Sequence, residues 1–170
     1  MPLLLILIYL AFISLGLPDS LIGPSWPSIS NSLNSSIEFA GVVAIVVSMG
    51  TVISSLLTTR LINLLGTGKV VAISVLFTAV ALFGFSIVNS IWLLLILAIP
   101  LGLGGGAVDS ALNNYVATHY KAKHMNFLHS FWGVGASAGP FIMSFYLMQQ
   151  EGWRTGYSVI ACVQIALVIV

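Results

Sequence analysis

Charged residues are scarce in this chain. Of its 170 residues, only 5% are Asp, Glu, Lys or Arg, whereas 59% are hydrophobic. Soluble domains carry roughly 25% charged residues, so this composition cannot supply a water-facing surface. The formal net charge of +1 also excludes the basic patch that a nucleic-acid partner requires. The shortage of charge indicates a protein that lies in the lipid bilayer.

Cysteine is almost absent. The single Cys162 lies in an apolar run, so neither a disulfide framework nor a thiol-rich metal site is available. We expect Cys162 to be a small hydrophobic side chain of the core. The sequence therefore indicates no metal and no other cofactor.

The apolar residues form six stretches that are candidates to cross a membrane, which takes about 20 mostly apolar residues. The first runs from Leu3 to Leu17. At about 1.5 Å per residue it is too short, so Pro18–Ser30, bent by its prolines, must complete the crossing. The others are about Phe39–Leu65, Val70–Val88, Ile91–Thr118, Phe127–Met148 and a stretch from Tyr157 that is still apolar at Val170. The sequence predicts an all-α membrane protein, one six-helix bundle over residues 1–170.

The predicted connectors are short and polar: Asn31–Glu38, Gly66–Lys69, Asn89–Ser90, His119–Asn126 and Gln149–Arg154. Four of the five positive residues flank the second and fourth connectors, which lie on one side of a six-span chain. Positive residues favour the cytoplasmic side, so we expect these connectors and both termini in the cytoplasm of a cell with this protein in its plasma membrane. The first span lacks the basic start and the cleavage site of a signal peptide, and we expect a retained helix.

Two carboxylates, Asp19 and Asp109, stand inside predicted spans. An ionisable group at bilayer depth costs about 2.5–3.5 kcal/mol on insertion scales, so it indicates function. Asn113 lies four residues after Asp109 and shares its helix face, and Asn114 lies on the adjacent face. Asp19 follows Pro18, which frees a backbone carbonyl. A broken helix, carboxylates and amides are ingredients of a binding site near mid-membrane.

Polar residues also recur at helical spacing in the fifth predicted span, at Asn126, His129, Gly133 and Ser137. A second interpretation stays open, because amides and hydroxyls also hydrogen-bond neighbouring membrane helices at under about 1 kcal/mol each. For the carboxylates we favour function, since a charge demands more compensation than a hydroxyl.

Two patterns are typical of soluble enzymes. Residues 102–107 read GLGGGA, similar to a dinucleotide-binding loop, and residues 135–139 read GASAG, similar to a nucleophile elbow. An intramembrane serine hydrolase using Ser137 and His129 is therefore an alternative. Both patterns also contain glycines four residues apart, which let membrane helices approach closely, and we favour this packing interpretation.

The chain resembles the N-terminal half of a major facilitator superfamily transporter, which has six spans and cytoplasmic ends. The loop between its second and third spans usually reads G-x-x-x-D-[RK]-x-G-[RK]-[RK]. Here residues 59–69 read TRLINLLGTGK, with Asn63 in place of the aspartate and with Gly66 and Lys69 retained. The resemblance implies a conformational loop formed by Arg60, Asn63, Gly66 and Lys69.

A closer likeness is to the fucose:proton symporter and sugar-porter-like branch. Asp19 matches its first-helix carboxylate, residues 102–113 match a glycine-rich stretch followed by an acidic-x-x-x-Asn pattern, and residues 126–129 match an Asn-x-x-Gln-type element. The resemblance implies proton coupling by Asp109 and Asp19. It also implies that a sugar-like solute contacts Asn113, Asn114, Asn126 and His129.

The resemblance implies a secondary active transporter, not an enzyme, whose partners are the bilayer, a small polar solute and a coupling proton. Such transporters have two six-helix halves, and this chain resembles one. We expect it to be part of a twelve-helix transporter or, as an alternative, to pair with a second copy. A membrane assembly subunit that transports nothing is a further alternative.

Overall fold

The chain is described here by a computed structural model that covers residues 2–149 and 152–169. Every regular element in those residues is a helix: α1 (Pro2–Asp19), α2 (Ile22–Ser32), α3 (Phe39–Leu65), α4 (Thr67–Ile87), α5 (Ile91–His119), α6 (Ala122–Met148) and α7 (Gly152–Ile169). Helices α3 to α7 are each long and apolar enough to cross a membrane, and α1 with α2 forms one more candidate span, bent by 42°. The predicted all-α, six-span fold is confirmed.

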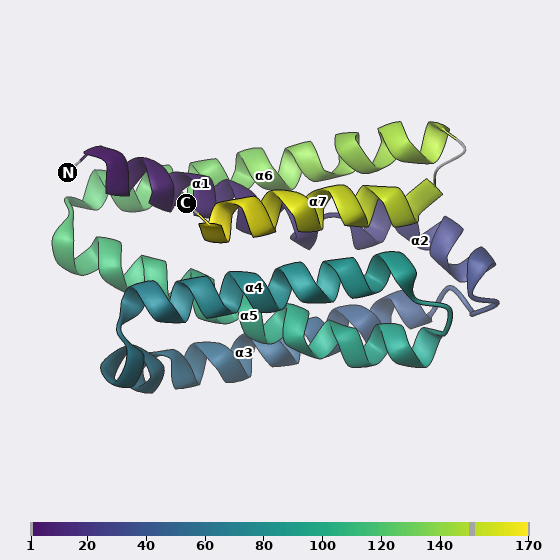
Figure 1. Cartoon of the computed structure of the whole chain (residues 1–170), viewed down its shortest axis with the longest axis horizontal. Coiled ribbons are helices and arrows are strands. Elements are labelled where there is room, and N and C mark those ends of the chain that lie inside the picture. The colour runs from purple at the N-terminus through teal and green to yellow at the C-terminus, as the bar shows by residue number, and fades with distance from the viewer. Residues whose placement is uncertain (1, 150–151, 170) are drawn as a thin grey trace.

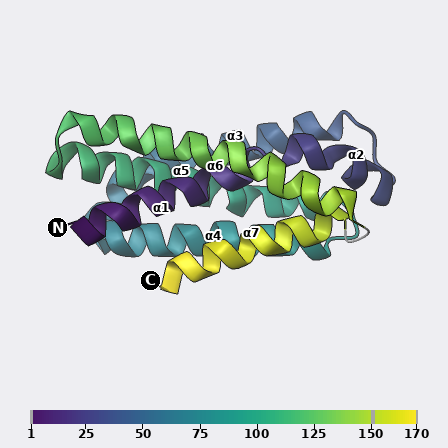
Figure 2. The ribbon, with the colours of Figure 1, turned by 90° about the horizontal axis from the view of Figure 1, so that it is seen from above.

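The helices run along the long axis of the molecule, and both termini lie at one end, together with the α3–α4 and α5–α6 connections (Figures 1 and 2). Helix α5 packs against α3 and α4, α4 packs against α7, and α1 packs against α6. The α2–α3 and α4–α5 connections lie at the opposite end, as do the last turn of α6 and the first turn of α7 (Figure 1). This is the up-and-down arrangement that short polar connectors predict.

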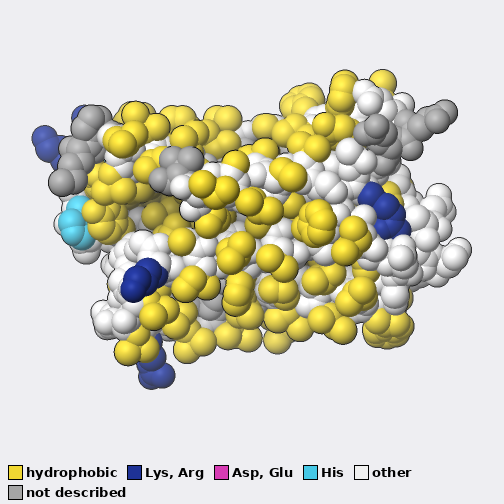
Figure 3. All heavy atoms as spheres, viewed as in Figure 1, with side chains coloured by type: hydrophobic (Ala, Val, Ile, Leu, Met, Phe, Trp, Pro, Cys, Tyr) yellow, Lys and Arg dark blue, Asp and Glu magenta, His cyan; other side chains and the backbone are white. Residues whose placement is uncertain are grey.

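The outer surface of the bundle is apolar. Figure 3 shows hydrophobic side chains along the middle of the molecule and Lys and Arg side chains near its two ends. Leu56 and Phe141 are more than three-quarters exposed, as lipid-facing side chains are. Cys162, which we expected in the core, is exposed on α7. That prediction is wrong because a lipid-facing surface selects the same apolar residues as a core.

Three helices begin earlier than their apolar stretches. The starts predicted at Val70, Phe127 and Tyr157 lie inside helices that begin at Thr67, Ala122 and Gly152. Polar residues therefore form the first turns of α4, α6 and α7, and the predicted connectors shrink accordingly. Hydropathy marks where a helix leaves the hydrocarbon, whereas the helix itself ends where its backbone hydrogen bonds end. The predicted connector residue Glu151 lies outside the described residues.

The expected conformational loop is mostly helical. Arg60 and Asn63 are exposed in the last turns of α3, and Lys69 is exposed in the first turn of α4. Gly66 alone separates these two helices, at a φ of 83°. Glycine is favoured at positive φ because it has no Cβ, so one residue is enough to reverse the chain here.

Glycines set the distance between α3 and α5. A Cβ at Gly102 would overlap the carbonyl oxygen of Val47, and a Cβ at Gly106 would overlap that of Thr51. The close approach also brings hydroxyls to glycine carbonyls: Thr51 Oγ1 donates to Gly102 O and Ser55 Oγ donates to Gly106 O, each at 3.3 Å. This confirms the packing interpretation of residues 102–107.

The second glycine pattern packs α6 against α1. A Cβ at Gly135 would overlap the carbonyl oxygen of Ile13, and a Cβ at Gly139 would lie 2.6 Å from the carbonyl oxygen of Leu17. From the other side, a Cβ at Gly16 would overlap a backbone carbonyl of α6. Residues 135–139 therefore also form a helix-packing surface.

The first turn of α7 is tied to the end of α4 by Arg154. Its guanidinium donates to the carbonyl oxygens of Ser86 at 3.2 Å and Val88 at 2.6 Å, and to Asn89 Oδ1 at 3.2 Å. It also lies over the Trp153 ring, 4.4 Å from the ring centroid. The last carbonyls of a helix have no helical donor and carry partial negative charge, so a guanidinium is a suitable partner.

A glycine substitution tests the α3–α5 contact. We expect Gly102→Ala to lower the free energy of unfolding by about 1–3 kcal/mol, because the added methyl group forces two backbones apart. Thermal unfolding in detergent measures the change. The matched control is Gly105→Ala in the same turn, where the nearest heavy atom to the new Cβ is a flexible side-chain carbon at 3.8 Å. Equal effects of the two variants would contradict this account.

Candidate functional site

The break in the first span lies at Ser20 and Leu21, between α1 and α2, and Pro18 stands just before it in the last turn of α1. Proline has no N–H, so the Ser14 carbonyl loses its helical partner four residues on. We expected this freed carbonyl to belong to the binding site. It lies instead inside the bundle, where it accepts a hydrogen bond of 2.9 Å from Gln164 Nε2. The break does place Asp19, the next residue, at a pocket.

This polar pocket has a volume of about 260 Å³ and lies between α1, α3, α4, α5 and α6. Its polar lining consists of Asp19, Thr51, Thr78, Asp109 and Trp132, one from each helix. Among the described residues, its lining contains no Lys or Arg. The pocket therefore collects both carboxylates of the predicted spans without a fixed positive charge beside them.

Asp19 is held by a residue that sequence reasoning missed. Trp132 Nε1, on α6, donates a hydrogen bond of 3.0 Å to Asp19 Oδ2. A signal for Trp132 was present in the sequence, because it stands inside a span rather than at the membrane interface where tryptophan is enriched. An indole N–H at that depth needs an acceptor.

Asp109 is held by its own helix. Asn113 Nδ2 donates to Asp109 Oδ1 at 3.1 Å, as the four-residue spacing suggests. Asp19 and Asp109 line the same pocket. The His129 ring meets Phe12 of α1 edge-on, 6.3 Å between centroids. Asn113 Oδ1 is buried and accepts no hydrogen bond from the described residues.

None of the four predicted solute contacts lines the pocket. Asn113 is linked to it by its hydrogen bond to Asp109, and His129 is exposed on α6. Asn114 and Asn126 are also exposed. Their recorded hydrogen bonds are local, from Thr118 to the Asn114 carbonyl and from Ser130 to the Asn126 carbonyl, each at 2.9 Å. The structure thus brings together Asp19 and Asp109, with Asn113 bonded to Asp109, and leaves Asn114, Asn126 and His129 outside the pocket lining.

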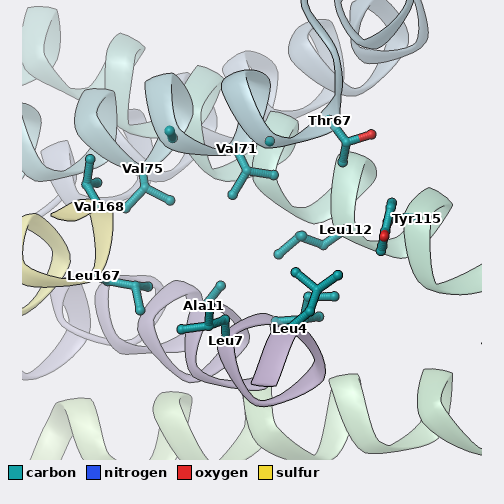
Figure 4. Close-up of a pocket in the computed structure, with 13 residues that line it drawn as sticks. Leu4, Leu7, Ala11, Thr67, Val71, Val75, Leu112, Tyr115, Leu167 and Val168 are labelled. Atoms are coloured by element: carbon teal, nitrogen blue, oxygen red, sulfur yellow. The ribbon is translucent and has the colours of Figure 1, made fainter. Parts of the chain in front are cut away.

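A larger pocket of about 430 Å³ lies between α1, α4, α5 and α7. In Figure 4, Leu4, Leu7 and Ala11 of α1 lie across it from Val71 and Val75 of α4. Its lining is almost entirely aliphatic and includes neither carboxylate. It offers few groups that could hydrogen-bond a polar solute, so the smaller pocket is the candidate site.

Comparison with known families assigns the bundle. The family profile of the Major Facilitator Superfamily matches residues 8–170. The chain belongs to the Major Facilitator Superfamily. A search of curated proteins found no match. As a superfamily member, the chain is a multi-pass protein of a membrane-transporter family whose members are typically not enzymes.

Membership of the Major Facilitator Superfamily and the geometry both contradict the hydrolase alternative. Ser137 and His129 lie on the same helix, eight residues apart, which is about 12 Å along its axis. A nucleophile and its base must lie within hydrogen-bond reach. The serine is instead part of the helix-packing segment at residues 135–139.

A double-mutant cycle can test the hydrogen bond between Asp19 and Trp132 in this superfamily member. We expect the effects of Asp19→Ala and Trp132→Phe on the free energy of unfolding to be non-additive by about 0.5–3 kcal/mol, because each removes the same hydrogen bond. Unfolding of the two single variants and the double variant in detergent measures the coupling. The control pair is Asp19→Ala with Trp92→Phe, an exposed α5 residue, and should be additive. Additivity in both pairs would contradict the bond.

Proposed function

We propose that this bundle is one half of a proton-coupled secondary transporter that moves a small polar solute by alternating access. The observation that carries the proposal is the meeting of Asp19 and Asp109, from two helices, in one pocket of an otherwise apolar bundle. Carboxylates at membrane depth are costly and mark ion and substrate pathways. A bound proton would neutralise the pocket and let the bundle change its facing without moving a bare charge through lipid.

The site also supports a solute that donates hydrogen bonds. Asp109 and Asn113 are acceptors that lie four residues apart on α5, and Asn113 Oδ1 has no hydrogen-bond partner among the described residues. Hydroxyl or amine groups of a solute would satisfy them, and we propose His129 as a further contact. The likeness to the fucose:proton symporter branch makes a sugar the solute class that we propose.

A second six-helix bundle would complete the site. Asp19 and Trp132 line the pocket and yet are exposed in this bundle, so the pocket is open on one side. Transporters of this kind bind their solute between two repeated halves. We propose a second half in the same polypeptide as the covering partner, with a second copy of this chain as the alternative.

The charge distribution supports an orientation. Arg60, Lys69, Lys121 and Lys123 lie in or beside the α3–α4 and α5–α6 turns, at the end that carries both termini (Figure 1). Positive residues near the ends of spans favour the cytoplasmic side. We propose that this end faces the cytoplasm and that the membrane is the plasma membrane.

Uptake into membrane vesicles tests the proposal. With the full-length protein, an imposed proton gradient should drive uptake of at least one labelled sugar, and Asp109→Asn should reduce that driven uptake to the level of empty vesicles. Exchange of labelled for unlabelled solute should survive in Asp109→Asn, because it needs no net proton movement.

The matched control is Glu38→Gln, which removes an exposed carboxylate just before α3 and should leave uptake unchanged. Driven uptake that persists in Asp109→Asn would contradict proton coupling at this residue. Absence of uptake of every sugar tested would contradict the proposed solute class.

A further inference from the structure

Gln164 is a buried amide between three helices. It lies on α7, is 1% exposed, and contacts α1 and α4 through different atoms. Its Nε2 donates to the Ser14 carbonyl at 2.9 Å, and its Oε1 accepts a hydrogen bond from Thr78 Oγ1. A carbonyl oxygen can only accept, so the amide nitrogen must face Ser14 and the amide oxygen must face Thr78.

The proline in α1 explains why an amide is needed. The Ser14 carbonyl would normally bond the N–H of the residue at position 18, which is Pro18 and has none. A buried acceptor without a partner is destabilising, and more so where no water reaches it. Gln164 supplies the missing donor at the turn of α1 that precedes the break.

The two hydrogen-bond partners of Gln164, Thr78 and Ser14, connect it to residues that line the pocket. Thr78 lines the pocket, and so does Pro18. Because Pro18 has no N–H, the Ser14 carbonyl is free to bond Gln164. Asp19, the residue after Pro18, accepts the hydrogen bond from Trp132. Gln164 itself does not line the pocket, so any effect on the site must pass through these neighbours.

We propose that Gln164 is a positioning residue, which fixes the break of α1 so that Asp19 stays in the pocket against Trp132. Its importance for transport rests on the proposed function, whereas the positioning is a property of the bundle alone. Losing the amide would let the turn around Pro18 seek another donor and would move Asp19 away from the indole.

Two substitutions separate positioning from simple packing. Gln164→Leu removes both hydrogen bonds and keeps a side chain of similar size. Gln164→Glu keeps both while its carboxyl is neutral, since the hydroxyl can donate to Ser14 and the other oxygen can accept from Thr78. Once ionised, it has no donor. Gln164→Glu should therefore behave like the parent protein at low pH and like Gln164→Leu at high pH.

The experiment is ¹⁹F NMR of the protein labelled with 5-fluorotryptophan, in detergent, with the Trp132 resonance identified by Trp132→Phe. We expect Gln164→Leu to move the Trp132 resonance to the position found in Asp19→Ala, while the resonance of the distant Trp92 stays in place. Gln164→Glu should move the Trp132 resonance only as the pH rises.

Ser158→Ala is the matched control on the same helix, because its hydroxyl donates locally to the Arg154 carbonyl one turn earlier, at 3.1 Å. An unmoved Trp132 resonance in Gln164→Leu would overturn the proposal, as would equal movement of the Trp92 resonance, which indicates general loosening. If Gln164→Leu does not fold, the pH response of Gln164→Glu decides, and a response identical to the parent protein overturns it.

The spectra need no transport, so the two proposals fail separately. A Trp132 resonance that moves as expected, in a full-length protein without proton-driven uptake, supports positioning and contradicts the proposed function. If proton-driven uptake is found but the Trp132 resonance is the same in the parent protein and the Gln164 variants, the function is supported and the positioning role is overturned.

Discussion

The interior of a bilayer offers no water to hydrogen-bond a polar group, and the ends and breaks of the helices in this bundle depend on this constraint. Where Pro18 removes a helical donor, Gln164 replaces it. Where α4 ends, Arg154 donates to its last carbonyls. Asp19 and Asp109 nevertheless lie together in one pocket. Helix packing does not require these two carboxylates.

Much of the fold could be predicted because it depends on local sequence. Six apolar stretches give six spans, and the glycine pairs at residues 102–107 and 135–139 indicate where backbones approach closely. The bond from Asn113 to Asp109 was also predictable, since both residues lie on one helix and the helical period fixes their relation. These features need no knowledge of which helices are neighbours.

The rest of the site depends on tertiary packing and escaped sequence reasoning. Trp132 and Asp19 are 113 residues apart, and Gln164 and Ser14 are 150 apart. Only the pairing of α1 with α6, and the place of α7 beside α4, brings them together. The same limit explains Asn126 and His129, which share helical spacing but both lie outside the pocket lining.

The central claim is that Asp19 and Asp109 face one pocket, and cross-linking tests it most directly. In a Cys162→Ser background, Asp19→Cys and Asp109→Cys would be treated with a short bifunctional thiol reagent, and the chain would then be cut at a protease site placed in residues 33–38. The account predicts that the two fragments stay joined, whereas Asp19→Cys combined with Ile73→Cys, on the exposed side of α4, leaves them separate. Fragments that separate equally in both proteins would contradict a shared pocket.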